Sequence, residues 1–80
     1  MNKVLLVDDH QLIRSGLSEI LNRTNDFEVV KMAGSVTETR LAIQHVPYDL
    51  AILDIRLPHG DGIPLSKLLI DQFPERPVLI

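Results

Sequence analysis

Three acidic residues directly follow two short apolar segments, in positions where they could act together. Val4-Leu5-Leu6-Val7 is followed by Asp8 and Asp9. Leu50-Ala51-Ile52-Leu53 is followed by Asp54. Continuous apolar runs of this length are typical of buried strands in a parallel sheet, and such sheets bind ligands at the carboxyl ends of their strands. If the two strands are neighbours, we expect the three carboxylates to meet at one edge of the sheet.

A cluster of three carboxylates is suited to metal-assisted phosphoryl chemistry. Like charges at close range disfavour one another's ionised form, and a hard divalent cation such as Mg²⁺ relieves that repulsion. Mg²⁺ binds through few carboxylates and keeps water and phosphate oxygens in its coordination shell. A carboxylate is also a nucleophile that can carry a phosphoryl group as an aspartyl-phosphate. One acid can therefore hold the metal ion while another attacks the phosphorus.

The same residues have simpler explanations, which this pattern alone leaves open. An acidic pair after a strand often caps the next helix, and an Asp such as Asp54 commonly only starts a turn. His10 beside the acids could indicate a transition-metal site, but a single nearby His is weak evidence for one. The other two histidines, His45 and His59, are most simply packed or solvated side chains.

The elements that must position these acids alternate between strands and helices. We expect four strands, over residues 3–7, 27–33, 50–54 and 78–80. The first helix should begin at Asp9 or His10 and end before a polar loop over residues 22–26. A second helix should run from Val36 to Pro47, after the capping box Ser35-x-x-Glu38. A third should follow Gly62, with Pro64 in its first turn, and end at Pro74.

Each predicted helix carries apolar residues at helical spacing, and these should face the sheet. The residues expected to face inward are Ile13, Leu17, Ile20 and Leu21 in the first helix, Val36, Leu41, Ala42 and His45 in the second, and Leu65, Leu68, Leu69 and Phe73 in the third. The element order β-α-β-α-β-α-β is typical of the α/β class, with a doubly wound parallel sheet and right-handed crossovers.

The composition limits what the chain can bind. Its 80 residues fit at most one small domain. The 8 Lys and Arg against 11 Asp and Glu give a net charge of -3, which argues against non-specific binding to nucleic acid. The absence of Cys excludes disulfides and fits a reducing cytosol. Because the sequence also has no signal-peptide pattern and no apolar run of membrane-spanning length, we expect a cytoplasmic protein without a membrane partner.

Two motifs make the chain resemble a known family. Val4-Leu5-Leu6-Val7-Asp8-Asp9-His10, together with Asp54-x-x-Leu57-Pro58-x-x-Asp61-Gly62, resembles the receiver domain of bacterial response regulators. The second motif has that family's pattern of Asp, two residues, Leu or Met, Pro, two residues, Asp or Asn, and Gly. The opening is similar in particular to LuxR-type transcriptional regulators, through Asp8-Asp9-His10 followed by Arg14, Gly16 and Leu17.

The resemblance implies a role for each matching residue. Asp54 would be the phosphoacceptor, taking its phosphoryl group from the phosphohistidine of a sensor histidine kinase. Mg²⁺ would be held by Asp8, Asp9, Asp54 and the backbone carbonyl of Arg56, while Pro58 and Gly62 would shape the loop after Asp54. The fold would be flavodoxin-like, with strand order 2-1-3-4. The chain would be a regulatory phosphoacceptor that assists its own phosphorylation and dephosphorylation, not an enzyme.

The sequence departs from the family after its fourth predicted strand. Receivers have five βα units, so this chain lacks counterparts of the family's Ser or Thr after the fourth strand and Lys after the fifth. We therefore expect residues 1–80 to be the N-terminal part of a receiver domain, with a DNA-binding output domain outside this sequence. An unpaired apolar strand and an incompletely covered sheet face predict self-association.

Two other functions are considered beside the phosphoacceptor. A truncated receiver that no longer accepts phosphate would act only as an interaction or dimerisation module. A phosphatase-like hydrolase with a strand-end Asp nucleophile usually needs a second acid two residues later. Arg56 occupies that position, which argues against a hydrolase.

Overall fold

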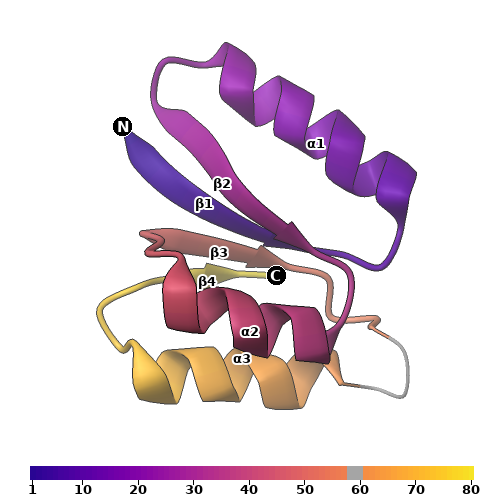
Figure 1. Ribbon diagram of the computed structural model, residues 1–80, viewed down its shortest axis with the longest axis vertical. Helices are drawn as coiled ribbons and strands as arrows, with labels where there is room; N and C mark the ends of the chain where they lie inside the picture. Colours follow the sequence, from indigo (N-terminus) through magenta and orange to yellow (C-terminus); the bar gives the residue numbers. More distant parts are fainter. Residues whose placement is uncertain (58–60) are drawn as a thin grey trace.

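The chain alternates strands and helices from end to end in the computed structural model, which describes residues 1–57 and 61–80 (Figure 1). The elements are β1 (Asn2–Val7), α1 (Gln11–Arg23), β2 (Phe27–Ala33), α2 (Val36–His45), β3 (Leu50–Leu53), α3 (Gly62–Gln72) and β4 (Val78–Leu79). This order confirms the predicted β-α-β-α-β-α-β arrangement. None of the helices in the described part of the chain is long and apolar enough to cross a membrane.

The four strands form one parallel sheet in the order β2-β1-β3-β4, as predicted. β1 lies between β2 and β3, and Val7 at its end is paired with both Ala33 and Leu53. Three strands therefore end at the same level of one edge. The helices form a layer on each side, with α1 over one face of the sheet and α2 and α3 over the other (Figure 1).

The main core lies between the sheet and the α2–α3 layer. From α3, Leu65 and Leu69 are one helical turn apart and almost completely buried. They pack in one cluster with strand residues including Leu5, Val7 and Leu53, and Leu68 and Phe73 pack against its margin. The predicted apolar stripe of the third helix is thus confirmed. Burial of each large aliphatic side chain in this cluster contributes about 1.5–3 kcal/mol to folding.

Helix α1 differs from its prediction in length and in burial. It runs through Arg23, so the predicted loop start at Asn22 was wrong by two residues. None of its residues is buried, and Ile13, Leu17 and Ile20 remain 48%, 36% and 61% exposed. Within the described residues α1 is the only helix on its face of the sheet (Figure 1). No second helix from the described part of the chain packs beside it there, so its apolar residues stay partly exposed to solvent.

Helix α2 begins at the predicted capping box. The Ser35 side chain accepts a hydrogen bond from the Glu38 N–H at 3.2 Å, and the Glu38 carboxylate accepts one from the Gly34 N–H at 2.9 Å. The predicted inward face was partly wrong, because Leu41 is 58% exposed and His45 is also exposed.

Thr39 and Ala42 are the residues of α2 that are buried. Thr39 can occupy a core position because its hydroxyl donates a hydrogen bond to the Ser35 carbonyl one turn earlier, at 2.8 Å. This local bond satisfies the polar group that burial would otherwise leave without a partner. A pattern of apolar letters cannot detect a core residue of this kind.

Candidate functional site

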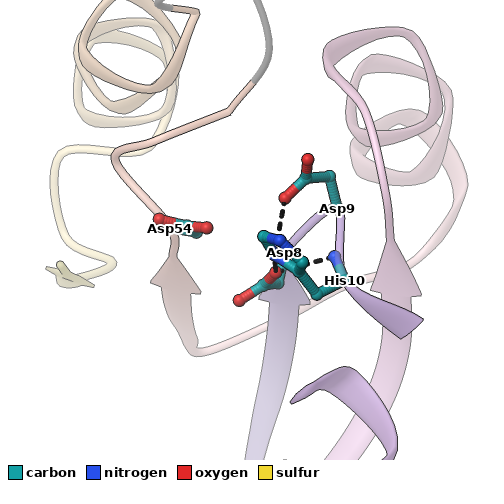
Figure 2. Close-up of side chains that lie close together, drawn as sticks. All are labelled: Asp8, Asp9, His10 and Asp54. Atoms are coloured by element: carbon teal, nitrogen blue, oxygen red, sulfur yellow. Dashed lines mark hydrogen bonds and ion pairs between the residues drawn. The ribbon is translucent and has the colours of Figure 1, made fainter. Parts of the chain in front are cut away.

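Adjacent strand ends bring Asp8 and Asp54 to the same edge of the sheet. β1 and β3 pair in parallel up to Val7 and Leu53, and the pairing continues for one more bond, from the Asp54 N–H to the Val7 carbonyl at 2.9 Å. Figure 2 shows Asp54 after β3 beside Asp8 after β1, with Asp9 and His10 on the chain leading to α1.

The four side chains are close enough to share one ion. One oxygen of each carboxylate and one ring nitrogen of His10 all lie within 4.8 Å of one another. The donor set is dominated by carboxylate oxygens, which are the ligands that hard divalent cations prefer. The chemistry of the residues present therefore fits Mg²⁺, with Asp8, Asp9 and Asp54 as the carboxylate donors.

Asp8 is the most enclosed of the acids, with 8% of its surface exposed. Its Oδ1 accepts a hydrogen bond from the His10 N–H at 2.8 Å, which closes a tight turn between β1 and α1. The N-cap of α1 is His10, and it makes no side-chain capping bond. The interpretation of the acidic pair as a helix cap was therefore wrong, although Asp8 does hold a turn.

The His10 ring lies against both acids of the pair. Its Nδ1 is 3.0 Å from Asp8 Oδ1 and 2.9 Å from Asp9 Oδ1. About two thirds of the side chain is exposed. His10 is thus a solvent-exposed neighbour of the acidic cluster. Of the other two histidines, His45 is exposed at the end of α2, and His59 lies outside the described residues.

Asp54 is held by the turn that follows it. Its Oδ1 accepts a hydrogen bond from the Arg56 N–H at 2.8 Å, which fixes the carboxylate relative to the backbone. Asp54 is half-buried and Arg56 is exposed. The ligand role predicted for the Arg56 carbonyl remains a prediction.

Asp8 and Asp54 line a groove between α1 and the sheet. Its volume is about 390 Å³, enough for a small phosphorylated group. Asp8, His10, Asp54 and Arg56 form its polar end, and its apolar wall includes Ile13 and Leu17 of α1. The groove gives a ligand access to the Asp54 carboxylate from one side.

Gly62 is required by the close approach of two backbones. A Cβ atom at this position would overlap the backbone of Ile55, in the turn after β3. A glycine at the first residue of α3 therefore lets the helix begin directly against that turn, which gives a physical reason for the loop-shaping role predicted for Gly62. Pro58, the other predicted loop residue, lies outside the described residues.

The sequence assigned no role to Arg14, although its guanidinium reaches the acidic cluster. Arg14 Nη1 donates a hydrogen bond to the main-chain carbonyl of Asp8 at 2.5 Å. The available signal was a basic residue in the first turn of a helix that follows two acids. That signal does not identify the bond, because the acceptor belongs to the backbone.

Comparison with known proteins identifies the class to which this fold and site belong. A sequence profile of the response regulator receiver domain matches residues 4–80, so the chain belongs to that family. The resemblance predicted from the two motifs is confirmed.

Three similar proteins define the likeness further. The chain is 42% identical over 80 residues to the DNA-binding transcriptional activator DevR/DosR of Mycobacterium tuberculosis. This match covers 100% of the chain and 37% of DevR/DosR. A LuxR-family two-component response regulator from Aurantimonas matches with a TM-score of 0.83 and 26% identity, over 98% of this chain and 56% of that one.

The third is RcsB from Salmonella enterica serovar Typhimurium, solved on the promoter rprA with the phosphomimetic BeF3-. It matches with a TM-score of 0.87 and 25% identity, over 98% of this chain and 66% of that one. The chain thus spans little more than a third of DevR/DosR and about two thirds or less of these two solved chains.

Proposed function

We propose that this receiver domain accepts a phosphoryl group on Asp54 in a Mg²⁺-dependent reaction with the phosphohistidine of a sensor histidine kinase. The observation that carries the proposal is the convergence of Asp8, Asp9 and Asp54 within 4.8 Å at the ends of two adjacent strands. The family of the chain and the BeF3- in the similar RcsB structure support it.

In the proposed reaction each acid has its own task. Asp8 and Asp9, with an oxygen of Asp54 and the Arg56 carbonyl, would hold the metal ion. When bound, Mg²⁺ neutralises charge on the carboxylates and on the phosphoryl oxygens. The free oxygen of Asp54 attacks phosphorus in line, so that an O–P bond forms while the N–P bond of phosphohistidine breaks. The electron pair of that bond stays with the imidazole nitrogen, which takes up a proton.

The wider role follows from the relatives. We place the chain in a transcription regulator whose output domain binds DNA, because DevR/DosR is a DNA-binding activator and RcsB was solved on a promoter. Residues 1–80 would be the receiver part of that protein, acting as a cytoplasmic regulatory phosphoacceptor and not as an enzyme. Its net charge of -3 argues that this segment does not contact nucleic acid itself.

A second candidate is an interaction module that does not accept phosphate. The exposed apolar residues of α1, together with Leu79 of β4 at 58% exposure, favour association with another protein or a second copy. The two candidates separate cleanly, because only the first requires Asp54 chemistry. Light scattering over a concentration series would test self-association, and a monomer at all concentrations would contradict it.

The proposal is tested with a small phosphodonor that contains an N–P bond, such as phosphoramidate. With Mg²⁺, intact-mass spectrometry should show the gain of one phosphoryl group, and Asp54→Asn should abolish it. Asp71→Asn is the matched control, since Asp71 is exposed on α3 outside the acidic cluster. Phosphorylation that persists in Asp54→Asn, or that proceeds equally in the presence of a chelator, would overturn the proposal.

A further inference from the structure

Arg14 connects α1 to the peptide group that joins the two acids after β1. It is the fourth residue of α1 and is half-buried. Its Nη1 donates to the Asp8 main-chain carbonyl at 2.5 Å. The Asp8 N–H is held from the other side, since it donates to the Ala33 carbonyl of β2 at 3.0 Å. Both backbone groups of Asp8 are therefore fixed, one by the sheet and one by Arg14.

Gly34 provides the space through which the guanidinium reaches this carbonyl. A Cβ atom built at position 34 would lie 2.8 Å from Arg14 Nη1 and 3.5 Å from its Cζ. The same Cβ would lie 3.8 Å from the Asp8 carbonyl oxygen. The backbone of Gly34 does not have the positive φ that favours glycine, so the glycine is needed here for space and not for its conformation. Arg14 and Gly34 thus form one contact across the ends of β1 and β2.

We propose that Arg14 is a positioning residue for the metal-binding acids and that Gly34 is the opening that allows it to act. This inference rests on the proposed function. The carbonyl that accepts the Arg14 bond belongs to the peptide between Asp8 and Asp9, so rotation of that peptide moves both side chains relative to Asp54. A hydrogen bond from a charged donor resists this rotation more strongly than a neutral one.

A purely electrostatic role for Arg14 predicts the opposite result. A guanidinium beside the cluster repels Mg²⁺, so loss of its charge alone would tighten metal binding. Loss of a positioning bond would instead weaken it, because the three carboxylates would no longer be held in one arrangement. The sign of the change in Mg²⁺ affinity therefore distinguishes the two roles.

The test measures the Mg²⁺ dissociation constant of the 80-residue chain by calorimetric titration. Arg14→Ala should raise it about tenfold to hundredfold, as expected when a bond to a charged donor is lost. Arg14→Lys should recover part of the affinity. Gly34→Ala should displace the guanidinium and raise the constant similarly, yet should add little in the Arg14→Ala background. Arg23→Ala is the control, since Arg23 is on the same helix and pairs only with Glu19 in the described residues.

Each result decides the matter. An Arg14→Ala dissociation constant that is unchanged or lower, with a lower melting temperature, would leave only a structural or electrostatic role and overturn the inference. Additive effects of Arg14→Ala and Gly34→Ala would overturn the part assigned to Gly34. If Arg14→Ala does not fold, Arg14→Lys and Gly34→Ala are judged by the same criterion. A wild-type chain that binds no Mg²⁺ would instead refute the proposed function.

Discussion

Neutralising Asp54 should stabilise the chain in the absence of Mg²⁺. Asp54→Asn removes one negative charge from the cluster but keeps an oxygen that can accept the Arg56 N–H bond. One oxygen of each carboxylate lies within 4.8 Å of one oxygen of the other two. At that distance two unit charges repel by about 0.9 kcal/mol in water-like surroundings, and physiological salt roughly halves this value. Since Asp54 faces two other acids, the variant should gain about 1 kcal/mol, or about 4–8 °C in melting temperature.

The measurement is thermal and urea unfolding followed by circular dichroism, at low and physiological salt, with and without Mg²⁺. The gain in Asp54→Asn should be larger at low salt, and the stabilisation that Mg²⁺ gives the wild type should largely disappear. Asp71→Asn should change neither quantity. A destabilised Asp54→Asn variant, or a gain that does not depend on salt, would refute the idea that carboxylate repulsion is stored at this edge.

Three further predictions concern single residues. Burial raises the pKa of Tyr48, with the charge of Arg76 opposing the shift; stability should therefore fall as pH rises above about 10, and Tyr48→Phe should remove that fall. At neutral pH the same variant should unfold with unchanged or slightly higher free energy, because the buried hydroxyl has no hydrogen-bond partner in the described residues. Gly62→Ala should cost about 1–3 kcal/mol in urea unfolding, because its methyl group would overlap the Ile55 backbone; an unchanged midpoint would contradict this close approach. His10→Ala should bind Mg²⁺ more tightly in calorimetric titration, because the ring contacts both acids after β1, and weaker binding would indicate that the ring helps to hold the ion.

The architecture and the convergence of the acids could be predicted because strong, short-range signals agree. Continuous apolar runs specify buried parallel strands, and right-handed crossovers leave few layouts for four of them. Once β1 and β3 are neighbours, Asp8 and Asp54 must leave the sheet together. The α3 stripe was also predictable, because Leu65 and Leu69 lie one turn apart on a helix packed against the sheet.

The burial of α1 and α2 and the contact of Arg14 could not be predicted, because they depend on residues that are distant in the sequence or on hydrogen bonds to the backbone. Periodicity gives the direction of an apolar face but not what covers it, so the exposure of Ile13 and Ile20 could not be predicted. Leu41 was predicted to face inward, and Thr39 was not recognised as a core residue. A hydrophobic pattern does not reveal the bond between the Thr39 hydroxyl and its own helix. The reach of Arg14 to a backbone carbonyl requires knowledge of where β1, β2 and α1 meet.

The pairing of β1 with β3 also has a consequence for folding kinetics. α1, β2 and α2 lie between these two strands in the sequence, so the acidic cluster depends on a contact of long sequence separation. Such contacts form slowly, because the chain loses the entropy of closing a long loop before the contacts can stabilise the fold. An intermediate in which β3 has not yet paired with β1 therefore cannot contain the complete cluster. A nascent chain would acquire the complete cluster only after β3 has emerged and joined the sheet. Because the cluster then forms late in folding, Mg²⁺ should slow unfolding more than it accelerates folding.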